Sequence, residues 1–265
     1  MAYYRIEYFS QALCRPTAFE VLLPNDPRPE SPYINNKYQK LPMGVLFLLH
    51  GYTGKAELWA PAELAEKYHF AIVMPSAENS FYLNGPATGH AFETLVGVEM
   101  VDYVRKTFHV VEDNSRTCIA GLSMGGFGAL HTGLAYPETF GKIGALSSAL
   151  IVHEVGHMKP GEGNPVANYD YYRGCFGDTE HVIESRNNPE VLVQELKKAG
   201  KKLPGIYMCC GTEDFLIENN REFHQFLEKE EVPHIYKEDP GIHDMVFWSS
   251  HIPDILRWMY DEGDD

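Results

Sequence analysis

The stretch CIAGLSMGGFGAL, residues 118–130, places one serine, Ser123, between a run of strand-forming residues and a run of helix-forming residues. Gly121 lies two positions before this serine and Gly125 two positions after it. A strand that turns at once into a helix strains the residue at the turn and crowds its neighbours, and glycine relieves that crowding. The pattern G-x-S-x-G therefore indicates a nucleophile elbow, which raises a reactive hydroxyl above a sheet. A glycine-rich turn that only packs a helix against a sheet is the alternative.

Segments typical of strands alternate with segments typical of helices along the chain. The predicted strands are 3–10, 17–23, 44–50, 70–75, 117–121, 142–148, 205–210 and 234–238, and the predicted helices are 59–68, 91–106, 124–136, 189–199, 215–230 and 245–260. This alternation predicts an α/β fold in which helices cover both faces of a mostly parallel central sheet. We expect residues 1–265 to form one domain, with a small, irregular, lid-like insertion at about 150–188.

Polar residues follow three of the predicted strands at the edge where open α/β sheets bind their ligands. They are Ser123, Asp214 and His243. A serine hydroxyl needs a base to become nucleophilic, and the base needs an acid to fix its tautomer. His243 is the candidate base, because the other histidines after Ser123 fall in helical patterns, in the insertion or at a strand start. Asp214 is the candidate acid and Glu213 the weaker alternative, and the order Ser, Asp, His is the one that this elbow uses.

Two backbone N–H groups are candidates to bind the negative charge that develops on the substrate carbonyl oxygen during acyl transfer. The Met124 N–H opens the helix after Ser123, where the helix dipole favours negative charge. The segment LLHGYTG, residues 48–54, ends an earlier buried strand, and the Tyr52 N–H within it is the candidate second donor. Together the two donors would form an oxyanion hole.

Three further residues are candidates for contact with a substrate. Gly51 lets the backbone approach closely, and His50 precedes it, although a loop brace is the favoured role for the His50 side chain. Tyr172 belongs to YDYYRGCFGD, residues 169–178, in the insertion. These aromatic side chains either cover the site as a lid or, as the favoured alternative, pack the insertion onto the domain.

A competing motif, HEVGH at residues 153–157, matches the zinc-protease signature H-E-x-x-H. The zinc site would need a stable helix that places His153 and His157 on one face. Gly156 lies within that turn, and MKPGEGNP follows directly, so any helix ends within a few residues of His157. Glu180 would have to serve as the third ligand, without a supporting pattern. We therefore expect no metal, and two histidines that at most line a substrate entrance.

Net charge, apolar runs and cysteine content limit the partners and the cellular location that the sequence predicts. A formal net charge of −15 disfavours nucleic acids and anionic membrane surfaces. The sequence contains no apolar run of about 18 residues, so it predicts no membrane-spanning helix. Its first residues lack the basic segment followed by an apolar segment that is typical of a signal peptide. The five cysteines have no metal-type spacing and fit free thiols in a reducing cytoplasm, which is the expected location.

Five segments together carry a family resemblance: LLHGYTG, NSFYLN, GLSMGGFGAL, CGTEDFL and GIHDMVFW. Across about 44–250 the chain resembles the esterase D-like group of α/β-hydrolases. That group includes short-chain carboxylesterases of the tributyrin-esterase type, feruloyl and acetylxylan esterases, and S-formylglutathione hydrolases. The resemblance implies an α/β-hydrolase fold with Ser123 as nucleophile, Asp214 as acid and His243 as base. It also implies Tyr52 and Met124 as the oxyanion donors.

The sequence thus predicts a serine esterase that acts on short-chain acyl or aryl esters through an acyl-enzyme, with a small-molecule ester as its partner and no cofactor. A thioesterase of the S-formylglutathione hydrolase type is the main alternative. A zinc hydrolase that uses HEVGH and a non-catalytic binding module of the same fold are the others. The natural ester, whether a simple short-chain ester, an acetylated sugar or a hydroxycinnamate, is left open, and so is a homo-oligomeric state.

Overall fold

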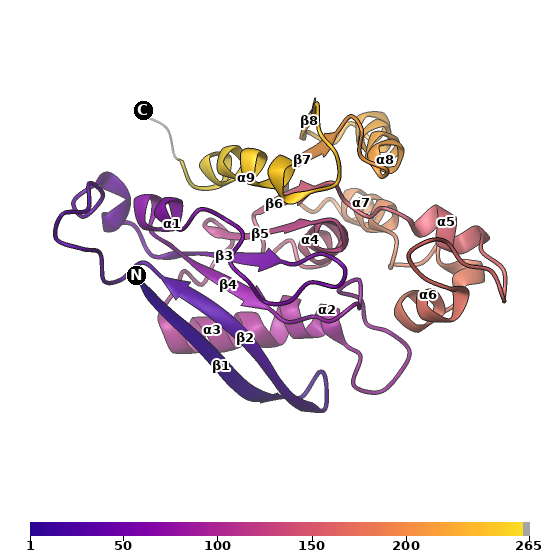
Figure 1. Cartoon of the computed structure of the whole chain (residues 1–265), viewed down its shortest axis with the longest axis horizontal. Coiled ribbons are helices and arrows are strands. Elements are labelled where there is room, and N and C mark those ends of the chain that lie inside the picture. Colours follow the sequence, from indigo (N-terminus) through magenta and orange to yellow (C-terminus); the bar gives the residue numbers. More distant parts are fainter. Residues whose placement is uncertain (262–265) are drawn as a thin grey trace.

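An eight-stranded sheet forms the centre of the computed structural model, which describes residues 1–261. The strands are β1 (Ala2–Ser10), β2 (Arg15–Leu23), β3 (Gly44–Leu49), β4 (Phe70–Pro75), β5 (Thr117–Leu122), β6 (Lys142–Leu146), β7 (Gly205–Gly211) and β8 (Ile235–Asp239). They lie in the order β1-β2-β4-β3-β5-β6-β7-β8 (Figure 1). β1, β2 and β4 pair antiparallel, and every pair from β4 to β8 is parallel. The predicted mostly parallel α/β sheet is confirmed, while residues 262–265 of the expected domain lie outside the described range.

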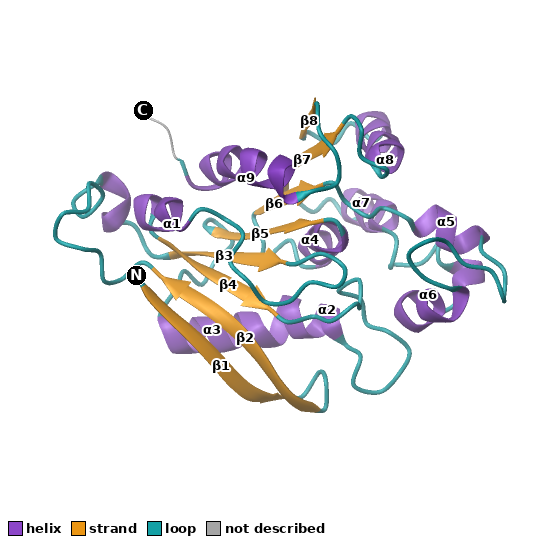
Figure 2. Ribbon diagram, in the orientation of Figure 1, coloured by secondary structure: helices purple, strands orange, loops and turns teal. Residues whose placement is uncertain are grey.

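Helices cover both faces of this sheet (Figure 2). They are α1 (Ala62–Tyr68), α2 (Phe92–Thr94), α3 (Met100–Phe108), α4 (Met124–Ala135), α5 (Val152–His157), α6 (Tyr169–Phe176), α7 (Pro189–Lys198), α8 (Ile217–Lys229) and α9 (Met245–Tyr260). The apolar side chains of α1 and α9 pack on one face, and those of α3, α4, α7 and α8 pack on the other.

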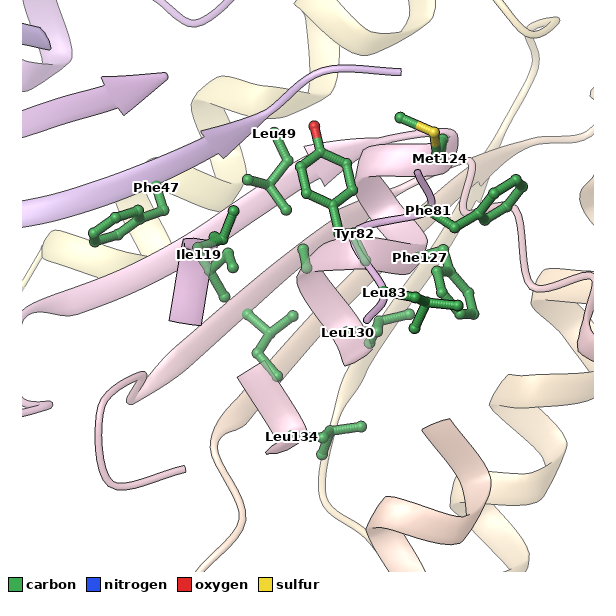
Figure 3. Close-up of a cluster of buried hydrophobic side chains, with 14 of the residues drawn as sticks. Phe47, Leu49, Phe81, Tyr82, Leu83, Ile119, Met124, Phe127, Leu130 and Leu134 are labelled. Carbon is green, nitrogen blue, oxygen red and sulfur yellow. The ribbon is translucent and has the colours of Figure 1, made fainter. Parts of the chain in front are cut away.

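The central strands are buried on both faces, as their continuous apolar sequence predicts. In β3, Phe47 and Leu49 belong to the core on the α4 side, whereas Leu46 and Leu48 belong to the core under α1 and α9. Figure 3 shows Phe47 and Leu49 in the same cluster as side chains of α4. A rigid, fully buried β3 therefore leads directly into the loop that begins at His50.

The predicted last helix, 245–260, coincides with α9. The spacing of apolar residues also predicts one inner face for this helix. The five residues on that face are all buried: Trp248, Ile252, Ile255, Leu256 and Met259. The Asp244 side chain caps the helix by accepting hydrogen bonds from the N–H groups of Val246 and Phe247, both at 3.0 Å. This cap fixes the chain directly after His243.

The helix predicted at 91–106 is not continuous. A π-helical turn, η2 (Leu95–Glu99), lies between α2 and α3. Gly97 of this turn lies against Tyr136, where an added Cβ atom would come within 2.3 Å of the ring. A hydrophobic period near 3.6 does not distinguish one widened turn from a regular helix, so the sequence pattern could not show the interruption.

The expectation of an irregular segment at 150–188 is wrong at three places, because α5, α6 and the 3-10 turn η3 (Thr179–His181) form there. Asn168 caps α6 by accepting a hydrogen bond from the Tyr171 N–H at 2.9 Å. Tyr172 and Phe176, four residues apart on α6, are buried. An Asn cap followed by apolar side chains at helical spacing was the signal for α6. Figure 1 shows α5 and α6 beyond the end of the sheet toward which β3 points.

In the part of the chain described here, no helix combines the length and the apolar character needed to cross a membrane.

Candidate active site

The turn between β5 and α4 has the geometry expected of a nucleophile elbow. Ser123 adopts φ 55° and ψ −119°, a strained conformation for a residue with a side chain. A Cβ atom added at Gly121 would lie 2.1 Å from the carbonyl oxygen of Gly125, and one added at Gly125 would lie 2.5 Å from that of Leu49. The crowding expected on both sides of the serine is therefore present, and only glycine fits at either position.

Replacing Gly121 by alanine is expected to lower the free energy of unfolding by about 3 kcal/mol, because the added methyl group meets backbone that cannot move aside. Urea unfolding followed by circular dichroism measures this loss. Gly174→Ala is the matched control, since Gly174 lies in α6 and an added Cβ would meet nothing within 4 Å apart from its chain neighbours and the backbone of its own helix. That variant should be neutral or more stable by up to about 1 kcal/mol. Equal stabilities of the two variants would contradict the crowding argument.

Three polar side chains from distant parts of the chain meet above the sheet. His243 Nε2 lies 2.9 Å from Ser123 Oγ. His243 Nδ1 lies 2.8 Å from Asp214 Oδ2 and 3.0 Å from Oδ1. Because a carboxylate only accepts, Nδ1 carries the proton and donates it, which leaves Nε2 free to accept the Ser123 hydroxyl hydrogen. The structure thus brings Ser123, His243 and Asp214 into one hydrogen-bonded chain.

The Asp214 carboxylate is buried, with no exposed side-chain surface. Burial would raise its pKa, but hydrogen bonds from His243, the Leu216 N–H and the Ser147 hydroxyl outweigh burial and hold the pKa below its usual value. The carboxylate therefore stays ionised at neutral pH. Glu213, the alternative acid, accepts a hydrogen bond from the Gly241 N–H at 2.7 Å and makes no contact with His243 among the described hydrogen bonds.

Ser147 is a site residue that the sequence reasoning missed. It follows β6 directly, is fully buried and has a positive φ of 45°. Its hydroxyl accepts a hydrogen bond from the indole Nε1 of Trp248 at 3.0 Å and contributes to the low pKa of Asp214. The available signal was its position, because β6 also ends at the edge where the other polar residues gather.

The two candidate oxyanion donors border the same cavity as Ser123. Met124 is the first residue of α4, and no side chain caps that end of the helix. Among the hydrogen bonds of residues 1–261, none uses the backbone N–H of Tyr52 or of Met124. An added Cβ atom at Gly51 would lie 2.8 Å from the Leu122 side chain and 3.4 Å from Ser123 Cβ. Gly51 therefore lets the loop of Tyr52 approach the elbow closely.

His50 is buried and acts as a brace. Its Nε2 accepts a hydrogen bond from the Ala77 N–H at 3.0 Å, and its Nδ1 lies 2.8 Å from the Gly51 carbonyl oxygen. Burial lowers the pKa of His50, which keeps the ring neutral. Because Nε2 accepts and Nδ1 faces a carbonyl oxygen, the proton lies on Nδ1. His50 also lines the cavity, so the brace and a substrate contact are compatible roles.

A cavity of about 740 Å³ opens over Ser123. One wall comes from the segment 149–172, through Ile151, Glu154, Asn164, Pro165, Val166 and Tyr172. The Tyr172 hydroxyl lies 3.0 Å from Asn164 Nδ2, and the Tyr172 ring is buried with Phe81 and Phe176. The aromatic side chains of α6 therefore pack the insertion onto the domain, and Tyr172 also borders the cavity.

The HEVGH motif forms the short helix α5, which ends at His157. His153 Nε2 lies 3.2 Å from Glu190 Oε1, and His157 Nδ1 lies 2.6 Å from the His153 carbonyl oxygen. Within residues 1–261, no group of three or more His, Cys, Asp or Glu side chains is placed to hold a metal ion. Glu154, the acidic residue of the motif, borders the cavity over Ser123 instead.

Comparison with known proteins identifies the family. The family model described as "Putative esterase" matches residues 10–259. The chain is 39% identical to an acetyl esterase of Caldicellulosiruptor saccharolyticus over 98% of each chain. The substrate-bound fluorophosphonate-binding serine hydrolase F of Staphylococcus aureus superposes with a TM-score of 0.83 at 26% identity over 99% of each chain. The S-formylglutathione hydrolase of Staphylococcus aureus gives 0.78 at 26% over 98% of each. The chain therefore belongs to the "Putative esterase" family and is a serine carboxylic-ester hydrolase with the α/β-hydrolase fold.

Proposed function

We propose that this esterase hydrolyses short-chain acyl or aryl esters through an acyl-enzyme on Ser123, with His243 as base and Asp214 as the orienting acid. The observation that carries the proposal is the hydrogen-bonded chain from Asp214 through His243 to Ser123 Oγ, with distances of 2.8 and 2.9 Å, at the cavity. Proton transfer by a positioned base is worth about 10²- to 10⁴-fold in rate.

The reaction proceeds in two halves. Ser123 Oγ attacks the ester carbonyl carbon while His243 Nε2 takes the hydroxyl proton, and the carbonyl oxygen becomes an oxyanion. The N–H groups of Tyr52 and Met124 bind this oxyanion, and each such donor is worth about 10²- to 10³-fold in kcat. The oxyanion collapses, the ester C–O bond breaks, and His243 gives its proton to the departing alcohol. Water then attacks the acyl-enzyme by the same route and releases the acid.

The character of the cavity supports uncharged esters. Exposed apolar side chains line its mouth. Phe215 is 69% exposed, and the centroid of its ring lies 4.6 Å from the centroid of the His243 ring. The charged side chains that line it are Glu57 and Glu154, and no Lys or Arg is among the described lining residues. The relative at 39% identity is named an acetyl esterase, which favours a short acyl group. The similarity to an S-formylglutathione hydrolase supports the thioesterase as the alternative function.

A substrate panel tests the proposal. 4-Nitrophenyl esters of increasing acyl length, feruloyl and acetyl-xylose esters, and S-formylglutathione are compared by kcat/KM. A fluorophosphonate probe is applied in parallel, and peptide mass spectrometry locates the adduct. We expect the highest kcat/KM for uncharged short-chain or aryl esters and an adduct on Ser123. Absence of any serine adduct would revive the binding-module alternative, and loss of activity with a chelator would favour the zinc hydrolase.

Glutathione carries two carboxylates, so the negative charge of the cavity should disfavour glutathione thioesters relative to uncharged esters. Replacing Glu154 by glutamine is expected to raise kcat/KM for an anionic ester, mono-4-nitrophenyl succinate, by about two- to fivefold at low salt. The value for neutral 4-nitrophenyl acetate should stay unchanged, and the gain should shrink at high salt. Glu180→Gln, in the same insertion but not lining the cavity, is the matched control. An unchanged preference in Glu154→Gln would show that Glu154 does not discriminate by charge.

A further inference from the structure

The loop that carries the Tyr52 N–H needs support from outside. We define the oxyanion loop as residues 50–54. Thr53 of this loop adopts a positive φ of 61°, a conformation that costs a β-branched residue of order 1–3 kcal/mol and persists only where neighbours fix it. An N–H group that stabilises a developing charge must also be held in place before the reaction begins.

The support comes from one segment, residues 76–82, which we call the bracing loop. On one side of Tyr52, His50 is held twice: its Nε2 accepts from the Ala77 N–H, and its carbonyl oxygen accepts from the Tyr82 hydroxyl, both at 3.0 Å. On the other side, the Thr53 N–H donates to Asn79 Oδ1 at 2.7 Å. Hydrogen bonds with the bracing loop therefore fix the chain on both sides of Tyr52, at His50 and at Thr53.

The bracing loop is itself anchored in the core. Phe81 and Tyr82 are 3% and 0% exposed, although both have positive φ values, of 53° and 55°. Figure 3 shows the two rings in the same cluster of buried side chains as residues of α4. The segment therefore offers a rigid base, and only the Asn79 side chain reaches from it to the far side of Tyr52 among the described hydrogen bonds.

Asn79 also connects this base to helix α6. Its backbone carbonyl oxygen accepts from the Tyr171 hydroxyl at 2.6 Å and from Cys175 Sγ at 3.3 Å. The Tyr171 ring in turn packs edge-on against the Tyr52 ring, with centroids 5.7 Å apart. Asn79 does not border the cavity over Ser123 and instead lines a separate hollow beside α6.

We propose that Asn79 is a positioning residue that aims the Tyr52 N–H at the oxyanion by holding Thr53, and that it ties this aim to the placement of α6. The proposal rests on the proposed function, because it takes Tyr52 as an oxyanion donor. Since the Thr53 N–H is a donor, Asn79 must present its amide oxygen, so loss of that oxygen is the informative change.

Asn79→Ala is expected to lower kcat by about ten- to a hundredfold with little change in KM, because a misdirected donor loses much of its stabilisation of the transition state. A thionoester, in which sulfur replaces the carbonyl oxygen, supplies the specific readout, since sulfur is the weaker acceptor of N–H hydrogen bonds. The ratio of kcat/KM for the ester to that for the matched thionoester should fall in Asn79→Ala. A merely structural role would lower both values equally.

Asn84→Ala is the matched control. Asn84 also accepts a hydrogen bond from a backbone N–H, that of Thr94 at 3.1 Å, but it makes no contact with the oxyanion loop among the described hydrogen bonds. Its kcat should stay within about twofold of wild type. Tyr171→Phe keeps the ring on Tyr52 and removes the hydroxyl from the Asn79 carbonyl. It should lower kcat by about two- to fivefold in the same direction, and it carries the test if Asn79→Ala does not fold.

The outcomes separate this proposal from the proposed function. If Asn79→Ala keeps the wild-type ester-to-thionoester ratio, or if only KM rises, Asn79 does not position the donor, while serine-dependent hydrolysis by the wild type still stands. If the wild type shows no hydrolysis that depends on Ser123, the proposed function itself fails. Thermal unfolding of each variant confirms that the compared proteins are folded.

Discussion

Replacing Ser123 by alanine is expected to lower kcat for hydrolysis of 4-nitrophenyl acetate by about 10⁵- to 10⁶-fold. In the proposed mechanism Ser123 Oγ forms the acyl-enzyme, and among the described residues that line the cavity Ser123 alone has a side chain hydrogen-bonded to His243 Nε2. Loss of one oxygen atom leaves the elbow backbone and its glycines in place, so the melting temperature should change by only a few degrees. Initial rates at saturating substrate measure the effect.

A second serine serves as the control for this variant. Ser185 lies in the insertion, its hydroxyl donates to the Val182 carbonyl oxygen at 2.8 Å, and it does not line the cavity. Ser185→Ala should keep wild-type kcat and wild-type labelling by a fluorophosphonate probe. Ser123→Ala should lose both. Wild-type turnover by a folded Ser123→Ala protein would refute the assignment of the nucleophile.

Periodicity along the sequence predicted the elements that carry the site. A continuous apolar run predicted β3, strand-forming residues predicted β4 and β5, and the repeat of apolar residues along 245–260 predicted α9 and its buried face. These elements are decided by burial of their own side chains, which the sequence shows directly. The insertion was described less well, because α5 and α6 have only six and eight residues and are stabilised by packing on residues far along the chain.

The sequence predicted three residues of the candidate site, which follow three of the strands. The three strands β5, β7 and β8 are parallel, with β7 next to β8 and only β6 between β5 and β7. The residues that follow them, Ser123, Asp214 and His243, therefore gather at one edge of the sheet. Ser147 follows β6 at the same edge, but its position alone did not show its hydrogen bonds with Trp248 and Asp214. Asn79 does not directly follow a strand. The roles of Ser147 and Asn79 depend on contacts between loops, such as the one between Asn79 Oδ1 and the Thr53 N–H, and a strained backbone that no periodic pattern encodes.

Replacing Asp214 by asparagine is expected to lower kcat about 10⁴-fold while leaving the site nearly unchanged in shape. In the wild type, the carboxylate accepts from His243 Nδ1 at 2.8 Å, which leaves Nε2 unprotonated toward Ser123. The amide of the variant can donate to Nδ1 instead, which moves the ring proton to Nε2, and Nε2 then no longer accepts the Ser123 proton. Because hydrogen bonds hold the pKa of Asp214 low, the wild-type acid is ionised at neutral pH, so the comparison at pH 7 reports the change of tautomer.

Glu213→Gln is the matched control for the acid, because Glu213 is the neighbouring carboxylate and holds the Gly241 N–H. Its kcat should stay within a fewfold of wild type, and a loss comparable to that of Asp214→Asn would assign the acid to Glu213. A double variant carries the argument further. In the proposed mechanism the three side chains act as one unit, so adding Asp214→Asn to Ser123→Ala should cause little further loss. Independent, multiplying losses in the double variant would mean that Asp214 acts on the reaction by a route other than His243 and Ser123.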